Sequence, residues 1–247
     1  MNKLSIMAKT VIITMSMVGI AYADKDFAHH SLLNSWTGFY VGANAGVMFN
    51  NAQLKSQQLG FTDPNDTCNA SSNLSSFFPG IQLGYMHQFS SYFVSGIEAN
   101  ITLNTKQKDT LGCTSAYSNT IYDRFSFRNQ LQSSIKGRLG RALNWNKSVI
   151  LPYLTAGVSF ANVGLTYRNE GGDYYSKNTT SPGWLIGAGI EWAFSQNWSL
   201  RAEYSYADYG NAINLNIPGV YGLLDPNGSA HANLSSNNVV VSINYWI

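Results

Sequence analysis

Apolar and polar residues alternate along much of the chain after residue 37. In the run 38–49 every second residue is apolar, from Phe39 to Phe49, whereas the intervening positions carry Tyr40, Asn44 and several glycines. A period of two is typical of a β-strand whose two faces meet different environments. We predict eight strands from such runs, with Pro152 at the start of the fifth. The runs are 38–49, 80–89, 93–103, 124–140, 152–160, 184–194, 198–206 and 239–247.

The apolar faces of these runs separate two kinds of all-β protein. A soluble sandwich also alternates, but its faces away from the core are charged, and the eight apolar faces here contain no Asp, Glu, Lys or Arg. Charged residues make up 11% of the chain and aromatic residues 13%, whereas an average soluble domain has about 25% charged residues. Aromatic residues also gather near the strand ends, as in the girdles of a membrane barrel. We therefore predict an all-β fold, an eight-stranded antiparallel up-and-down transmembrane β-barrel.

The links between the predicted strands alternate in length. Short links follow the second, fourth and sixth strands, whereas the links 50–79, 105–123, 167–181 and 210–237 are long and rich in Asn, Ser, Gly and Thr. Membrane barrels have short periplasmic turns and long extracellular loops. We therefore expect four long extracellular loops and two periplasmic termini.

The first residues have the order of a secretory signal peptide. Lys3 and Lys9 precede an apolar run at 11–20, and Ala21 and Ala23 follow it at the small-residue positions of a cleavage site. The alternative, a transmembrane helix, would need roughly 20 apolar residues. We predict a signal peptide at 1–23, cleavage after Ala23, a barrel domain at 24–247 and a location in the bacterial outer membrane.

Charged residues within the strands fall on the face opposite to the apolar one, and they lie at a similar height above the predicted short turns. Three are acidic and three are basic, so their charges cancel, which is the condition for burying ions without a severe desolvation penalty. An eight-stranded barrel is just wide enough for side chains to fill its lumen. We predict a paired ionic plug there, and the alternative is a proton or ion pathway. The six residues are Glu98, Lys136, Arg138, Glu191, Arg201 and Glu203.

Few other residues offer chemistry. Cys68 and Cys113 lie in neighbouring long loops of an exported chain, which predicts one disulfide. His231 is the one histidine that an enzyme could use, and we interpret it as a solvated loop residue. His29 and His30 could bind a metal, but two histidines without further ligands would be a weak site. We expect no catalytic residue, no metal and no cofactor. The net charge of +2 without blocks of like charge indicates no nucleic-acid partner.

Several segments carry a resemblance to a known family. They are 36–46 (WTGFYVGANAG), 151–158 (LPYLTAGV), 183–191 (GWLIGAGIE) and 197–204 (NWSLRAEY) followed by 208–210 (DYG). Together they resemble the first, fifth, sixth and seventh strands of the Omp25/Omp31-like outer-membrane proteins, within the OmpA-like β-barrel group. The resemblance implies an eight-stranded barrel without an assigned enzymatic activity, in a family described as surface antigens, adhesins, structural proteins, haemin-binding proteins or small porins. The chain departs from this family in ending on Trp246-Ile247 instead of Phe.

These observations lead to one functional hypothesis and two rivals. We expect a structural or surface-exposed interaction protein, adhesin-like or antigen-like, in which a plugged barrel anchors the loops that bind. Its expected partners are outer-membrane lipid and lipopolysaccharide, with a host or environmental ligand at the extracellular loops. The first rival is a small porin or ion channel, which requires a water-filled lumen. The second is a lipid-modifying outer-membrane enzyme, which requires a histidine with catalytic partners at the rim.

Overall fold

The computed structural model describes residues 36–57, 67–105, 109–115, 118–145, 148–169, 174–217 and 228–247. Within these residues the chain forms one antiparallel sheet of ten strands. The strands are β1 (Gly38–Gln57), β2 (Thr67–Gln88), β3 (Phe93–Leu103), β4 (Asp109–Ser115), β5 (Ser118–Arg141), β6 (Leu143–Trp145), β7 (Ser148–Asn169), β8 (Tyr174–Ala193), β9 (Trp198–Ile217) and β10 (Gly228–Trp246). None of the described segments is a helix with the length and apolar character needed to cross a membrane.

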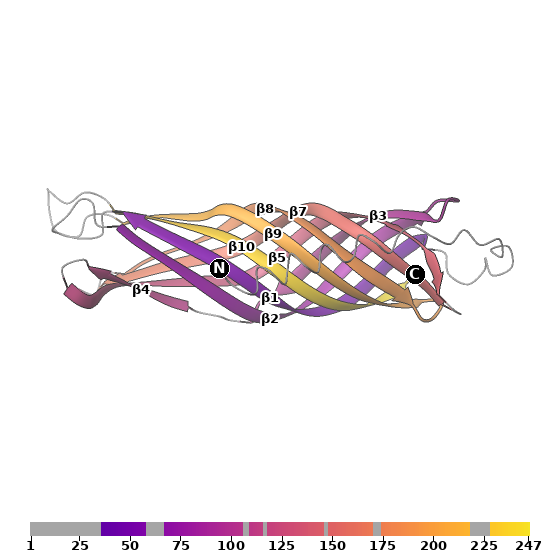
Figure 1. The fold of residues 1–247 in the computed structure, drawn as a ribbon, viewed down its shortest axis with the longest axis horizontal. Coiled ribbons are helices and arrows are strands. Elements are labelled where there is room, and N and C mark those ends of the chain that lie inside the picture. Colours follow the sequence, from indigo (N-terminus) through magenta and orange to yellow (C-terminus); the bar gives the residue numbers. More distant parts are fainter. Residues whose placement is uncertain are drawn as a thin grey trace. The chain divides into compact units, whose positions relative to one another are not determined.

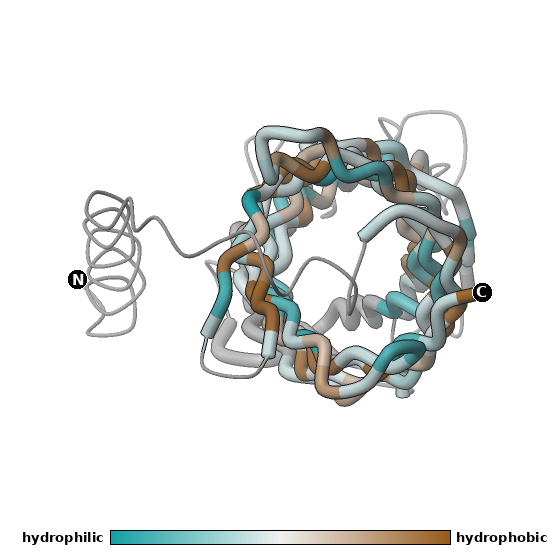
Figure 2. The backbone as a smooth tube through the Cα atoms, turned by 90° about the vertical axis from the view of Figure 1, so that its right-hand side faces the viewer, coloured by the Kyte–Doolittle hydropathy of each residue, from teal (hydrophilic) through white to brown (hydrophobic). Residues whose placement is uncertain are grey.

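The sheet closes into a barrel because β5 pairs with both β3 and β7. Eight strands thus form a complete ring, which Figure 2 shows in a view along the barrel. The two short strands extend this wall: β4 continues the position of β3 along β5, and β6 pairs with the first residues of β7 where β5 has ended. Figure 1 shows neighbouring strands side by side and oblique to the long axis. The prediction of an eight-stranded antiparallel barrel is confirmed.

The middle of the barrel exposes an apolar belt. Ile81, Leu154 and Ile186 point outward there and leave 65%, 67% and 55% of their surface exposed. Exposed aromatic side chains border the belt on both sides. They are Phe89, Phe93, Trp192, Phe194 and Trp198 on one side and Phe49, Phe77, Phe160 and Trp184 on the other. An apolar wall between two aromatic girdles is the surface that a barrel presents to lipid.

The two ends of the barrel differ in their connections. At the short-turn end, residues 89–92 join β2 to β3 and residues 194–197 join β8 to β9. At the long-hairpin end, the hairpins β1–β2, β7–β8 and β9–β10 continue well past the second girdle. Short turns face the periplasm in such barrels, so the long-hairpin end is the extracellular one.

The expectation of long loops was wrong over much of their length. Strand β1 continues to Gln57 and β2 begins at Thr67, with residues 57 and 67 still paired, although 50–79 was expected to be a loop. Strands β7 to β10 likewise run far into 167–181 and 210–237. The apolar pattern reverses in these extensions: Val163, Leu165 and Tyr167 face inward and are buried. A sequence search for strands with an apolar outer face therefore misses the strand segments that extend beyond the lipid, because their outer face is polar.

These inward residues form what we call the hairpin core, which lies inside the barrel at its extracellular end. It includes Ala52, Ala161, Val163, Leu165, Tyr167, Leu185, Ala207, Tyr209, Ile213, Leu215, Ala232 and Leu234. Outward positions at the same height are polar, as at Gln53 and Asn214. This half of the barrel is built like a water-soluble β-protein, because it buries apolar residues inside and exposes polar ones.

Pro152 was expected at the start of a strand, and that expectation was wrong. It is the fifth residue of β7 and pairs with Ile190 of β8. On its other side the pairing of β7 changes partner, from β5 at Tyr153 to β6 at Ile150. Pro lacks a backbone N–H. Because the ladder of β7 is interrupted where its partner changes, Pro152 removes no hydrogen bond from a continuous ladder at this position.

Candidate functional site

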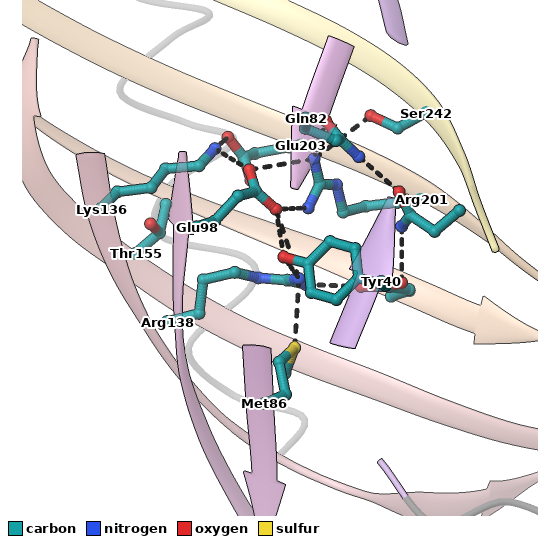
Figure 3. Close-up of polar contacts among 12 residues, drawn as sticks. Tyr40, Gln82, Met86, Glu98, Lys136, Arg138, Thr155, Arg201, Glu203 and Ser242 are labelled. Carbon is teal, nitrogen blue, oxygen red and sulfur yellow. Dashed lines mark hydrogen bonds and ion pairs between the residues drawn. The ribbon is translucent and has the colours of Figure 1, made fainter. Parts of the chain in front are cut away.

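The structure places all six charged strand residues in one layer of the lumen, which we call the ionic layer. Their relative exposures range from 0% for Glu98 and Glu191 to 6% for Lys136. The sheet register brings them to this height: Glu98 of β3 lies opposite Lys136 of β5, and Glu191 of β8 lies opposite Arg201 of β9. The side chains then reach across the lumen, as Figure 3 shows for most of them.

Glu98 is the centre of the layer because it contacts all three cations. Its Oε1 lies 3.2 Å from Lys136 Nζ, and its Oε2 lies 3.7 Å from Arg138 Nη1. Arg201 uses both terminal nitrogens on this carboxylate, Nη1 on Oε2 and Nη2 on Oε1 at 3.3 Å. Tyr40 also donates its hydroxyl to Oε2 at 2.5 Å. A buried carboxylate with this many donors has no need of water.

Glu191 lies at the short-turn side of the layer, and its partners are a cation and two neutral donors. Arg138 Nη2 donates to Oε2 at 2.6 Å. Ser199 Oγ and Asn244 Nδ2 donate to Oε1 at 2.6 and 2.7 Å.

Glu203 is held by Lys136 Nζ on Oε1 and by the Tyr153 hydroxyl on Oε2 at 2.7 Å. The layer thus contains five ion pairs between three cations and three anions. The formal charges of these six residues cancel.

Neutral residues of the site were missed by sequence reasoning. Gln82 accepts a hydrogen bond from Arg201 Nη2 at 2.5 Å and one from Asn44 at 2.9 Å. Tyr40 and Tyr153 each hold a carboxylate from a position opposite a glycine, Gly84 and Gly189. A Cβ built on Gly84 would lie 2.5 Å from the Tyr40 hydroxyl oxygen. A tyrosine opposite a glycine on the inner face is thus a sequence signal that could have identified Tyr40 and Tyr153 as residues of the site.

Clusters of buried apolar side chains lie on both sides of the ionic layer. Toward the short turns lies the aromatic plug, made of Trp36, Tyr40, Met86, Val94, Ala142, Leu151, Ala193 and Trp246. The rings of Trp36 and Trp246 meet edge to face, 5.4 Å apart. Toward the extracellular end lies the hairpin core. Between it and the ionic layer is a polar chamber of about 40 Å³, bordered by Asn44, Lys136 and Glu203, which is room for only a few waters.

A family model for the outer membrane protein beta-barrel domain matches residues 14–245. The chain belongs to this family. It is therefore an outer-membrane β-barrel protein, and its apolar belt faces lipid. The resemblance to Omp25/Omp31-like proteins is confirmed by the relatives described next.

The chain is 29% identical, over 184 residues, to the 31 kDa outer-membrane immunogenic protein of Brucella melitensis, covering 71% of this chain and 72% of the relative. It is also 29% identical, over 179 residues, to the 25 kDa outer-membrane immunogenic protein of Brucella ovis, covering 72% of each. The solved structure of the outer membrane protein OprG from Pseudomonas aeruginosa superposes with a TM-score of 0.54 at 13% identity, covering 85% of this chain and 96% of OprG. This outer-membrane protein shares the barrel fold with the present chain.

The other predicted residues have different outcomes. His231 is not in a loop: it lies in β10, where its Nδ1 is 2.7 Å from Asn214 Oδ1. The expectation failed because this strand extends further than its apolar pattern indicates. Cys68 and Cys113 lie in β2 and β4, but their side chains lie outside the described part of the structure, and their disulfide stays a prediction. The predicted signal peptide, with His29 and His30 after it, also lies outside the described residues.

Proposed function

We propose that this outer-membrane barrel is a surface-exposed interaction protein, adhesin-like or antigen-like, whose wall is an anchor and whose long hairpins bind. The observation that carries this proposal is that the aromatic plug, the ionic layer and the hairpin core place buried side chains at three heights inside the barrel. In this proposal these side chains plug the lumen, which leaves the extracellular hairpins as the surface that can meet a partner.

The comparisons support a role at the cell surface. Both Brucella relatives are named immunogenic outer-membrane proteins, and we extend surface exposure to this chain as part of the proposal. Its partners are then lipopolysaccharide and phospholipid around the wall, and a host or environmental ligand at the hairpin ends.

A pore and an enzyme remain the rival functions. A pore needs a continuous water path through the lumen, and the buried side chains at these three heights support a lumen without such a path. An enzyme at the rim needs a histidine with a nucleophile or a carboxylate, whereas the ring of His231 forms a hydrogen bond with the side-chain amide of Asn214. We therefore propose a protein without enzymatic activity.

Two measurements test the proposal. Purified protein in planar bilayers should give no stable channels, and reproducible conductance would favour the pore. A variant in which 58–66 and 218–227 are replaced by short turns should lose binding to immobilised fibronectin, collagen, laminin and heparin. A barrel with its own hairpin ends, refolded in parallel, is the matched control. If neither protein binds any of these probes, or if both bind equally, the proposed role of the hairpin ends is wrong.

A further inference from the structure

The lipid-facing wall has a groove of about 520 Å³ near the short-turn end. Its border is mostly apolar and includes Trp145, Ile150, Ile190, Trp192, Ala202 and Val241, with Ser148 and the buried Arg201 as its polar residues. These residues come from five strands, β6 to β10. The groove lies outside the barrel, on the opposite side of the wall from the ionic layer, and it does not belong to the lumen.

The sheet register explains why the groove forms here. Ala202 of β9 lies between Ile190 of β8 and Val241 of β10, so a methyl group stands between two branched side chains. Trp192 lies opposite Ile150 of β7 and borders the depression at Ala202 on the side of the short turns. The small side chain at Ala202 is therefore the floor, and its larger neighbours are the sides.

Strand β6 supplies the remaining side. It is three residues long and pairs only with the first residues of β7, with Trp145 opposite Ser148. It extends the wall toward the periplasm beyond the end of β5 and leaves the Trp145 ring 58% exposed. An indole at the membrane interface is placed where the headgroups begin. One end of the groove thus reaches the headgroup region, and the other lies within the apolar belt.

We propose that this groove is a binding site for one phospholipid of the periplasmic leaflet, with an acyl chain lying over Ala202 between Trp145 and Val241. Three observations point to this occupant. The groove opens onto the belt that lipid covers, its border is mostly apolar, and its headgroup end lies on the periplasmic side. Neighbouring strands are about 4.8 Å apart, so five strands span roughly 19 Å, a length comparable to an extended acyl chain.

The expected selectivity comes from packing. Bulk lipid is as apolar as the groove, so the hydrophobic effect does not favour one location over the other. A chain that fits the groove gains dispersion contacts on several sides, whereas a chain on a convex part of the wall gains them on one side. Filling the groove from the protein side should therefore remove the preference without changing the rest of the wall.

The test compares variants of the purified barrel after extraction from vesicles that contain phosphatidylethanolamine. Ala202→Phe fills the groove. Ala43→Phe is the matched control, because Ala43 is also an exposed alanine between two branched side chains, Ile81 and Ile243, but it lies outside the groove. Native mass spectrometry counts the phospholipid molecules retained as the detergent concentration rises. A heat-dependent shift in gel mobility shows that each variant is folded.

We expect the wild-type protein and Ala43→Phe to retain one phospholipid. Ala202→Phe should reduce the retained fraction by roughly tenfold. Trp145→Ala, which removes a side of the groove without touching its floor, should act in the same direction. Equal retention in Ala202→Phe and Ala43→Phe, or no retained lipid in the wild-type protein, would overturn the proposal. A dimer that is lost in Ala202→Phe, with no change in retained lipid, would also overturn it and would make this face a contact between two copies.

Discussion

Replacing Arg201 by alanine tests the ionic layer most directly. Arg201 is 1% exposed and donates to both oxygens of Glu98, to Gln82 at 2.5 Å and to Ser242 at 3.3 Å. Breaking a buried ion pair from one side typically costs about 3 to 5 kcal/mol. Glu98 would still contact Lys136 at 3.2 Å and Arg138 at 3.7 Å, so we expect the low end of that range, about 3 kcal/mol.

The measurement is a urea titration of the barrel in phospholipid vesicles, followed by tryptophan fluorescence. Arg141→Ala is the control, since Arg141 is an exposed arginine at the edge of the same wall and its loss should change the unfolding free energy by less than about 0.5 kcal/mol. The double variant Arg201→Met with Glu98→Gln keeps the layer neutral. Its loss of unfolding free energy should therefore be smaller than the sum of the losses measured for Arg201→Met alone and Glu98→Gln alone.

A loss of less than about 0.5 kcal/mol in Arg201→Ala would refute the reasoning, because a side chain this buried and this well bonded would then contribute nothing. Conductance is a second measurement on the same variant. The aromatic plug and the hairpin core do not depend on Arg201, so we expect no stable channel in Arg201→Ala. A steady current would mean that the ionic layer alone closes the lumen.

Three further outcomes are expected. The intact mass of the purified protein should correspond to a chain that begins at Asp24, and a mass that includes the signal peptide would contradict the predicted cleavage. Alkylation without reduction should leave Cys68 and Cys113 unmodified, and reduction should lower stability by about 2 to 4 kcal/mol, whereas two thiols that react in the native protein would exclude the disulfide. Gly84→Ala should cost about 1 to 3 kcal/mol because its methyl group meets the tyrosine hydroxyl opposite. Gly137→Ala, whose nearest neighbour is 3.8 Å away, should cost less, and equal losses would contradict this reasoning.

The lipid-facing half of the barrel could be predicted because lipid imposes a strict rule on sequence. Outward residues of a spanning strand are predominantly apolar, so the run from Phe39 to Phe49 identifies both the strand and its orientation. The extracellular extensions obey no such rule. Val163, Leu165 and Tyr167 follow the opposite pattern within a polar stretch, and the sequence alone does not say where the lipid ends.

The six charged residues could be assigned to the lumen by alternation, but their partners could not. Glu98 and Lys136 face each other in the register and form an ion pair. Glu191 and Arg201 also face each other, yet Arg201 crosses the lumen to Glu98, and Arg138 takes Glu191. Long side chains in a narrow barrel reach the opposite wall, so the pairing depends on the stagger of all eight strands.

The reversed pattern of the long hairpins has a consequence for how this sequence can change over generations. Outward residues above the second girdle, such as Gln53 and Lys55, are exposed, whereas their inward neighbour Ala52 is buried. Polar replacements at every second position should therefore leave the fold intact while altering the surface that an antibody meets. We expect substitutions among related strains to concentrate on these alternate positions and to spare the ones between them.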